Sequence, residues 1–364
     1  MNQLMRSNRT SRRAETTWIR RGRSRAAAAV AAAGLVALPV TPAVAGAASA
    51  AAPTSTAKPA APPLTFAIYP GGAAGGGSPH PLPDRPAKIE AALSTLQGRQ
   101  REFLVRDYAS CPGTSVNQDR RYLTHGRRLD LVLIGTTMPL ARWLSCVRTV
   151  VGKYGPEAAV ISVTLEVNLK PTRAAERQLV AGVIAAHAAA AKLSGSKPQI
   201  GFDEVADGQA GTGFWRALAK LGGTPFTRSV GYVGVDMYPG SFNGPTMHLA
   251  AQVTDILHVV RATQMPIAGL GQQVPIRVSE NGWQTDTAAR LARQPGAISS
   301  MIHTVNADRA ADHVLSYGLF DLRDELLKSK NPFDHLGLML ANYQPKPAFW
   351  TYRKLVAQLG GCPV

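Results

Sequence analysis

The sequence predicts an α/β fold, a single (β/α)8 or TIM barrel that spans residues 64–360. From Leu64 onward, short and almost wholly apolar runs alternate eight times with stretches of helical periodicity. This alternation is typical of a parallel sheet covered on both faces, and eight strand–helix units are the number that closes a barrel. Polar residues follow the apolar runs, at the strand ends where a barrel carries its functional groups.

The expected strands are apolar runs that are bounded by glycine, proline or polar residues. In chain order they are Leu64–Tyr69, Glu102–Tyr108, Leu129–Gly135, Ala159–Glu166, Gln199–Glu204, Val230–Tyr238, Pro275–Glu280 and Leu315–Leu322.

Helices are expected between the strands, where apolar residues recur at helical spacing. They include Pro139–Tyr154, Arg173–Leu193, Met247–Thr263, Gly296–Ala311 and, after the last strand, Pro347–Leu359. The alternative to a barrel is an open doubly wound sheet. The glycine-rich stretch 71–77 follows the first strand, but it lacks the spacing of a dinucleotide-binding loop and the lysine of a phosphate-binding loop. We therefore favour the barrel.

Residues 1–45 have the order of an export signal. A basic segment, Arg20–Arg25, is followed by an alanine-rich apolar run from Ala26 to Val40 and by the cleavage pattern Ala43–Ala45. Residues 46–63 are rich in Ala and Pro, and we expect them to form a disordered linker. The sequence therefore predicts a secreted protein with no membrane insertion after signal cleavage. An uncleaved membrane anchor is the alternative.

The formal net charge of +17 does not indicate a nucleic-acid binder. Residues 1–25 contain eight Arg and one Glu, which is +7, so the remainder carries 17 − 7 = +10. Basic residues such as Arg120, Arg121, Arg127 and Arg128 are scattered along the chain without the clustering and interleaved aromatic residues of a nucleic-acid interface. We expect a basic solvated surface, no nucleic-acid partner and a monomer.

Three cysteines are present, Cys111, Cys146 and Cys362. In an oxidising compartment one pair can form a disulfide and leave one thiol over. Cys111 with Cys146 is the preferred pair, because both fall near the second strand and the third helix. The chain has no CxxC motif and no Cys/His cluster, so we expect neither a metal site nor a cofactor.

Polar residues gather where the expected strands end. In chain order these residues are Arg106, Asp107, Glu166, Asn168, Asp203, Glu204, Asp236, Tyr238, Glu280, Trp283, Asp321 and Asp324. Because the carboxyl ends of the strands share one rim of a barrel, these side chains are expected to surround a single active site.

Two glutamates stand out among the rim residues. Glu166 ends the fourth expected strand and Glu280 ends the seventh, and these strands lie on opposite sides of an eight-stranded barrel. Their carboxyl groups are therefore expected to face each other across the barrel mouth. Two carboxyl groups about 5–5.5 Å apart are what a retaining glycosidase requires. The chain has no Gly-x-Ser-x-Gly elbow, which argues against a serine nucleophile.

The motifs around these glutamates resemble those of a known group of enzymes. The segment Ser279–Trp283 (SENGW) resembles the nucleophile motif of clan A of the retaining glycoside hydrolases, and Thr164–Asn168 (TLEVN) resembles its acid/base segment. The chain also resembles secreted actinobacterial barrel proteins of glycosidase type, through Gly234–Gly240, Asp321–Asp324 and Gly337–Phe349. The resemblance covers roughly residues 64–358.

The resemblance implies a role for each site residue. Glu280 would be the nucleophile and Glu166 the acid/base. Arg106 would hydrogen-bond the nucleophile and keep it ionised, Tyr238 would approach it from the sixth strand, and Trp283 would stack on a sugar. Asn168 and Asp236 would bind the substrate or support the site.

Two positions depart from the clan pattern. Leu165 stands where the clan has an asparagine that binds the sugar 2-hydroxyl group, and Phe320 stands near the place of a tryptophan on the eighth strand. A lost contact of this kind slows the reaction. We therefore predict a weakly active, secreted retaining O-glycoside hydrolase that cleaves a poly- or oligosaccharide by double displacement through two glutamates. The alternatives are a catalytically silent carbohydrate-binding barrel and a basic surface protein used for adhesion.

Overall fold

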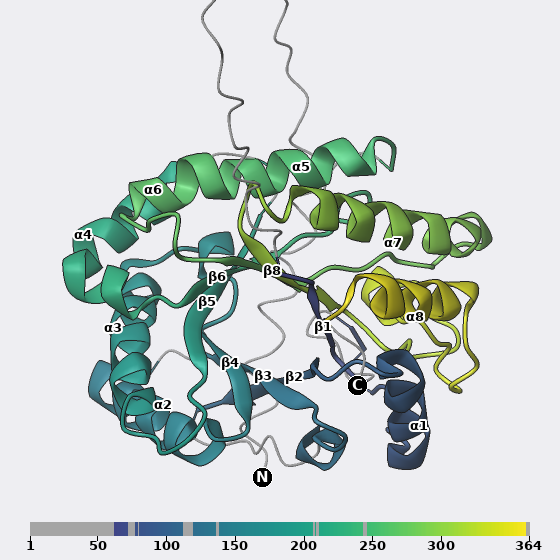
Figure 1. Cartoon of the computed structure of the whole chain (residues 1–364), viewed down its shortest axis with the longest axis horizontal. Helices are drawn as coiled ribbons and strands as arrows, with labels where there is room; N and C mark the ends of the chain where they lie inside the picture. Colours follow the sequence, from purple (N-terminus) through teal and green to yellow (C-terminus); the bar gives the residue numbers. More distant parts are fainter. Residues whose placement is uncertain are drawn as a thin grey trace, which may run out of the picture. The chain divides into compact units, whose positions relative to one another are not determined.

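Eight parallel strands pair in chain order, and the first strand pairs with the last, so that the sheet closes into a barrel (Figure 1). In the closing pair, Phe66 lies beside Tyr317. The structure is a computed structural model, and it describes residues 62–71, 77–78, 80–111, 119–135, 138–206, 208, 211–242 and 246–361. The single α/β (β/α)8 barrel expected from the sequence is confirmed.

The strands lie where the apolar runs predict them, with ends that differ by at most three residues. They are β1 Thr65–Ile68, β2 Phe103–Ser110, β3 Arg128–Ile134, β4 Ala158–Val163, β5 Gln199–Val205, β6 Tyr232–Asp236, β7 Ile276–Glu280 and β8 Val314–Leu319. The largest difference that bears on function is in β4, which ends three residues before Glu166.

The helices lie outside the strands and cover the barrel (Figure 1). They are α1 Pro86–Gln97, α2 Leu140–Tyr154, α3 Arg173–Ala190, α4 Thr212–Ser229, α5 Leu249–Val259, α6 Met265–Ile267, α7 Ala288–Asp308 and α8 Pro347–Leu359. Short 3-10 turns are η4 Asp119–Tyr122, η5 Val167–Leu169 and η7 Pro332–His335, and a π-helical turn, η6 Val260–Gln264, continues α5.

Two connections differ from the sequence-based expectation. Between β2 and β3 the described residues contain only the 3-10 turn η4, so the alternation of strand and α-helix is broken there. Helix α7 begins at Ala288 and not at Gly296, because the side chain of Thr287 caps it by accepting a hydrogen bond from the backbone N–H of Arg290 (3.2 Å). Pro295, which directly precedes the expected start at Gly296, lies inside this helix.

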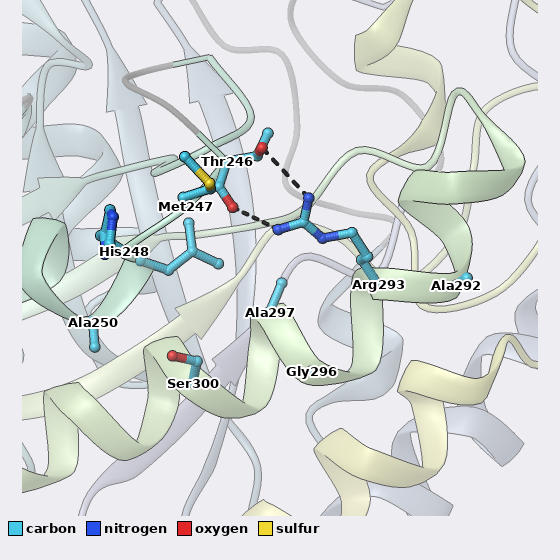
Figure 2. Close-up of a pocket in the computed structure, with 10 residues that line it drawn as sticks. Thr246, Met247, His248, Ala250, Ala292, Arg293, Gly296, Ala297 and Ser300 are labelled. Carbon is cyan, nitrogen blue, oxygen red and sulfur yellow. Dashed lines mark hydrogen bonds between the residues drawn. The ribbon is translucent and has the colours of Figure 1, made fainter.

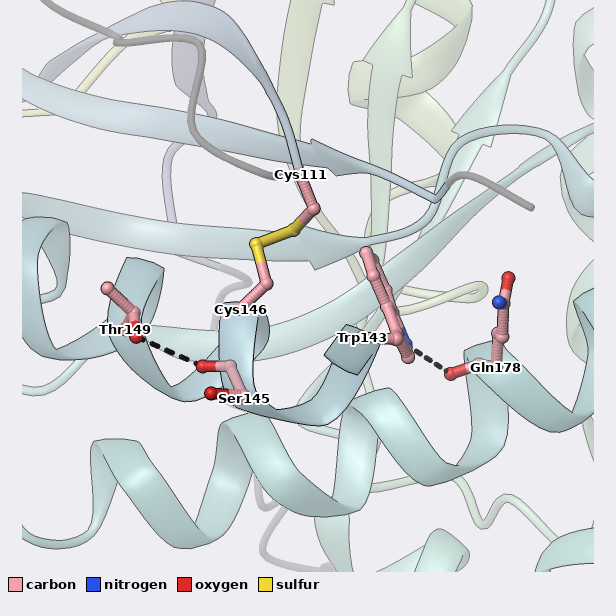
Figure 3. Close-up of a disulfide and its surroundings, with 6 residues drawn as sticks. All are labelled: Cys111, Trp143, Ser145, Cys146, Thr149 and Gln178. Atoms are coloured by element: carbon pink, nitrogen blue, oxygen red, sulfur yellow. Dashed lines mark hydrogen bonds between the residues drawn. A yellow bond between two sulfur atoms is a disulfide. The ribbon is translucent and has the colours of Figure 1, made fainter. Parts of the chain in front are cut away.

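A disulfide joins Cys111, just after β2, to Cys146 in α2 (Figure 3), with the two Cα atoms 6.0 Å apart. The predicted pair is therefore confirmed, and Cys362 lies outside the described residues. Nearby, the buried ring of Trp143 donates a hydrogen bond from Nε1 to the carbonyl oxygen of Gln178 (2.9 Å), which joins α2 to α3. Together these contacts fix α2 against its neighbours.

The expected signal peptide, residues 1–45, and residues 46–61 of the expected linker lie outside the described part of the chain. Within the described part, no helix combines the length and the apolar character needed to cross a membrane.

Candidate active site

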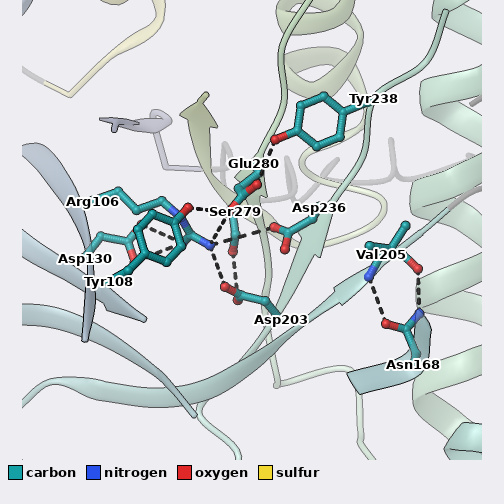
Figure 4. A network of polar contacts seen from close by, with 10 residues as sticks. All are labelled: Arg106, Tyr108, Asp130, Asn168, Asp203, Val205, Asp236, Tyr238, Ser279 and Glu280. Atoms are coloured by element: carbon teal, nitrogen blue, oxygen red, sulfur yellow. Dashed lines mark hydrogen bonds and ion pairs between the residues drawn. The ribbon is translucent and has the colours of Figure 1, made fainter. Parts of the chain in front are cut away.

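Charged side chains from five strands, β2, β3, β5, β6 and β7, meet at the carboxyl end of the barrel (Figure 4). Glu280 and Asp236 are the last residues of β7 and β6, and Arg106 lies within β2. Each is less than a tenth exposed. Because water is largely excluded, hydrogen bonds and charge interactions among these groups are stronger than at the surface.

Three donors point at the Glu280 carboxylate. Arg106 donates from Nη2 to Oε1 (3.1 Å), and the Tyr238 hydroxyl donates to Oε2 (2.7 Å). The hydroxyl of Tyr108 donates to Oε1 as well. These three hydrogen bonds fix the position of the Glu280 carboxylate at the mouth. Arg106 and Tyr238 thus lie where the sequence-based hypothesis places them.

Tyr108 is a residue of this site that the sequence analysis missed. It follows Arg106 by two positions in β2, so both side chains point to the same face of the sheet. Arg106 donates from Nε to the Tyr108 oxygen (2.9 Å), which leaves the phenol proton for Glu280. Burial, followed by the nearby Glu280 carboxylate, raises the pKa of Tyr108 well above its usual value and keeps that proton in place. The sequence offered one indication of this role, the position of Tyr108 two residues after Arg106.

Arg106 rests on two further carboxylates beneath the mouth. Its Nη2 lies 2.7 Å from Oδ2 of Asp203, and its Nη1 lies 3.3 Å from Oδ1 of Asp130. Asp203 also accepts a hydrogen bond from the Ser279 hydroxyl (3.1 Å), which ties it to β7. The guanidinium group is therefore fixed from below while it holds Glu280 from the side (Figure 4).

Glu166 is presented by a left-handed turn and not by the strand itself. Strand β4 ends at Val163, and both Thr164 (φ 72°) and Glu166 (φ 48°) have positive φ. The backbone N–H of Glu166 donates to the carbonyl oxygen of Asp203 (3.2 Å), which fixes the turn to β5. Non-glycine residues adopt this conformation at an energetic cost, and such positions are frequent in functional sites.

The predicted meeting of the two glutamates is confirmed. One carboxylate oxygen each of Glu166, Asp236 and Glu280 lies within 4.8 Å of the other two. Glu166 and Glu280 therefore approach each other at the barrel mouth.

The surroundings of Glu166 favour the protonated form. Burial, followed by the nearby carboxylates of Glu280 and Asp203, raises the pKa of Glu166 to about 8. A carboxyl group with this pKa holds a proton at neutral pH and can act as a general acid. The two glutamates therefore lie in different electrostatic surroundings.

Asn168 lies next to the site but supports it through the backbone. Its side chain donates from Nδ2 to the carbonyl oxygen of Val205 (2.7 Å) and accepts from the N–H of Val205 at Oδ1 (3.0 Å) (Figure 4). Both ends of the amide are thus occupied. Asn168 holds the turn that carries Glu166 against β5, which agrees with a supporting role.

The expected stacking of Trp283 on a sugar is wrong. The ring of Trp283 is 0% exposed, and its Nε1 donates to the carbonyl oxygen of Arg290 (3.0 Å). The guanidinium groups of Arg290 and Arg293 lie 5.7 and 5.5 Å from the centre of the ring. The chain turns inward after β7, so Trp283 packs beneath α7 and does not face the mouth.

Other aromatic rings line the mouth instead. Tyr69 stacks on Phe320, with ring centres 5.0 Å apart and planes 5° apart, and Tyr108 meets both rings edge-on. On the other side of Glu280, Tyr238 packs against Phe242, which stacks on Phe333 at 4.4 Å. Phe320 therefore stands on the β8 side of the mouth, near the place that the sequence analysis expected.

Among the described residues, the only group of three side chains placed to bind a metal ion is Glu166, Asp236 and Glu280. The donors around Glu280 already occupy that carboxylate, and both other carboxyl groups have raised pKa values, chiefly through burial. A metal ligand must be deprotonated, so these surroundings suit acid–base chemistry better than metal binding. The expectation that no metal is needed stays a prediction.

A separate pocket of about 480 Å³ lies between the start of α5 and the middle of α7 (Figure 2). Its lining includes Met247, His248, Arg293 and Ser300, and none of the carboxylates of the barrel mouth. Arg293 closes one side by donating to the carbonyl oxygen of Thr246 (2.6 Å). We place the chemistry at the mouth, where the charged groups converge.

The barrel is similar to solved glycoside hydrolase structures at low sequence identity. A family 39 glycoside hydrolase from Bacteroides cellulosilyticus WH2 has a TM-score of 0.60 and 12% identity, over 82% of this chain and 64% of the other. A GH5_18 protein from Streptomyces cattleya, in complex with GlcNAc, has a TM-score of 0.54 and 15% identity, over 84% and 83%. A GH2 beta-galacturonidase from Eisenbergiella tayi has a TM-score of 0.55 and 10% identity, over 83% and 52%.

These similarities define the class of fold. The chain spans 64% of the family 39 protein and about half of the GH2 protein. No protein-family model matches the sequence, and a search of curated proteins returns no match. The protein therefore has a (β/α)8 barrel similar to those of solved glycoside hydrolases.

Proposed function

We propose that the protein is a secreted retaining O-glycoside hydrolase that acts on a poly- or oligosaccharide. The observation that carries this proposal is the close pair of Glu166 and Glu280, whose surroundings favour a protonated acid and a charged carboxylate respectively. The glycosidase-like fold supports it.

The geometry supports a double displacement. Glu280 attacks the anomeric carbon and forms an ester, while Glu166 gives its proton to the departing glycosidic oxygen, so that the C–O bond breaks and the first product leaves as an alcohol. Glu166, now a carboxylate, takes a proton from water. The resulting hydroxide attacks the same carbon, breaks the ester bond and restores the Glu280 carboxylate. The configuration at the anomeric carbon is retained because it is inverted twice.

Two features bear on the rate and the location of the enzyme. Leu165 is half-buried beside Glu166, and its apolar side chain offers a sugar no hydrogen bond, which supports a slow enzyme. The Cys111–Cys146 disulfide supports export, because disulfides persist in oxidising compartments.

The test is turnover of aryl glycosides by the purified mature protein. We expect release of phenol above the blank and a first product of retained configuration, observed by NMR. Carbohydrate binding without turnover would favour the silent binding barrel instead. Retention of glycans that does not depend on Glu166 and Glu280 would favour adhesion by the basic surface.

A further inference from the structure

Asp236 is a third carboxyl group in the site, and the protein leaves it without hydrogen bonds. It is 0% exposed, and among the described residues neither Oδ1 nor Oδ2 has a hydrogen-bond partner. Arg106 forms a long ion pair with it, in which Nη2 lies 3.9 Å from Oδ1, beyond hydrogen-bonding distance. One carboxylate oxygen of Asp236 lies within 4.8 Å of oxygens of both catalytic glutamates.

This arrangement is costly for folding, because a buried carboxyl group without hydrogen bonds loses its hydration, and the long ion pair with Arg106 offsets only part of that loss. Its neighbours do not share the defect: Glu280, Asp203 and Asp130 all accept hydrogen bonds. The unused hydrogen-bonding capacity of Asp236 therefore points to a partner that arrives from outside.

The backbone turns Asp236 toward the two glutamates. Strands β6 and β7 pair residue by residue from Val233 to Val235, and the register then shifts so that Asp236 lies beside Glu280. Such irregularities re-aim side chains and are frequent next to active sites. In Figure 4 the Asp236 carboxyl points to the space next to Glu280, on the side away from Tyr238.

The charge state of Asp236 suits a polar and uncharged partner. Burial, followed by the carboxylates of Glu280 and Asp203, raises the pKa of Asp236 well above its usual value. This shift favours the protonated form, which has one O–H donor and one carbonyl acceptor. A sugar hydroxyl group, which also donates and accepts, matches it.

We propose that Asp236 is a substrate-binding residue that hydrogen-bonds the hydroxyl group on C2 of the sugar whose glycosidic bond is cleaved. This proposal rests on the proposed function. A sugar with its anomeric carbon between Glu166 and Glu280 has two ring atoms next to that carbon, C2 and the ring oxygen. The ring oxygen shares the positive charge of the transition state, so a donor there would oppose the reaction. The hydroxyl group on C2 is the partner that remains.

The test compares two aryl glycosides that differ only in the hydroxyl group on C2. Asp236→Leu keeps the number and branching of the heavy atoms but has no polar atom, and we expect it to reduce the preference for the 2-hydroxy substrate over the 2-deoxy substrate by about ten- to a hundredfold in kcat/KM. Asp236→Asn keeps one donor and one acceptor, and we expect it to retain most of the preference. Asp312→Asn is the matched control, because Asp312 is also a buried acid but precedes the amino end of β8.

Equal losses on both substrates would overturn the proposal, since they would mean that Asp236 only shapes the site. An unchanged preference would overturn it too. If Asp236→Leu does not fold, as judged by thermal unfolding, Asp236→Ala takes its place, because it only removes atoms.

A binding measurement can test the role of Asp236 even if the protein proves not to be a hydrolase. If the wild-type protein shows no turnover, calorimetry with 1-deoxynojirimycin and its 2-deoxy counterpart replaces kinetics. Tighter binding of the 2-hydroxy compound that is lost in Asp236→Leu would support the role of Asp236 while the hydrolase proposal fails. Equal affinities, or binding of neither compound, would overturn the role of Asp236.

Discussion

Glu166 and Glu280 carry the same side chain in very different surroundings. Glu280 accepts hydrogen bonds from a guanidinium group and two phenols, whereas Glu166 is buried near other carboxylates and has a pKa of about 8. Under the proposed function, this difference gives proton transfer to Glu166 and attack to Glu280. At the scale of the residue, the structure therefore makes predictions about each group.

Substituting the two glutamates separates their roles. Glu280→Gln removes the nucleophile, and we expect no covalent intermediate when the protein is treated with a mechanism-based fluoroglycoside. Glu166→Ala removes the general acid, and we expect a loss of about 10²–10⁴-fold on substrates with poor leaving groups and a much smaller loss on activated ones. Peptide mapping of the labelled wild-type protein provides the measurement. Label on a residue other than Glu280 would refute the assignment.

The raised pKa of Glu166 predicts the pH dependence of activity. Only the protonated form can donate to the leaving group, so kcat/KM should fall as pH rises above about 8. This fall in kcat/KM at alkaline pH should be absent in Glu166→Ala, because the residual rate of the variant does not require that proton. A profile of kcat/KM against pH for both proteins provides the test, and an identical alkaline limb in the variant would assign it to another group.

The same group predicts a dependence of stability on pH. Folding raises the pKa of Glu166 from 4.5 to about 8, so between these values the folded state holds a proton that the unfolded state has released. Stability due to this group therefore falls as pH rises through that range. Glu166→Gln should raise Tm relative to the wild type at about pH 8 and do so less at about pH 5. A Tm difference that does not depend on pH would contradict the assignment.

At the scale of the element, the turn after β4 decides where the general acid lies. Thr164 and Glu166 have positive φ, and the turn is held to β5 by the two hydrogen bonds between Asn168 and Val205. Strand β4 stops at Val163, before Glu166, so the strand itself does not position the Glu166 side chain. The position of Glu166 therefore depends on a side chain that touches no reacting atom.

Asn168→Ala tests this positioning role. We expect the loss of both hydrogen bonds to misplace Glu166 and lower kcat about ten- to a hundredfold on substrates with poor leaving groups. Activated substrates, which need little protonation, should be affected much less. Asn306→Ala is a control, because Asn306 accepts a hydrogen bond from Arg309 near the end of α7, away from the mouth. Equal losses on both substrate types would indicate general damage to the fold.

At the scale of the whole molecule, the disulfide compensates for the connection that lacks an α-helix. It joins residues separated by 35 positions and encloses η4, β3 and the start of α2. A crosslink over a loop of this length stabilises the folded state by about 3–4 kcal/mol in the chain-entropy description. Neither cysteine belongs to the carboxylate cluster.

Removing the crosslink should lower stability and spare the chemistry. We expect Cys111→Ala with Cys146→Ala to reduce the free energy of unfolding by about 2–4 kcal/mol, measured by denaturant titration. Turnover well below the unfolding temperature should change little. Cys362→Ala leaves the pair intact and serves as the control. An unchanged free energy of unfolding would show that the disulfide does not constrain the unfolded chain.

Much of the fold could be predicted because its signals are local. Each apolar run has the length and composition of a buried parallel strand, so all eight strands were placed within three residues. The positions of Glu166, Asp236 and Glu280 at the barrel mouth followed from the rule that strand ends share one rim. The start of α7 was missed because Pro295 obscured a helix that Thr287 caps upstream.

The sequence by itself determined the barrel, the pair of glutamates and the inward-facing Arg106, because period and position along each strand decide these features. Only the tertiary structure decided that Tyr108 serves Glu280, that Trp283 is buried, and that Asp236 has no hydrogen-bond partner. Tyr108 and Glu280 are 172 positions apart and meet across the barrel. Local periodicity carries no information about such contacts, since they depend on how distant strands face each other once the barrel closes.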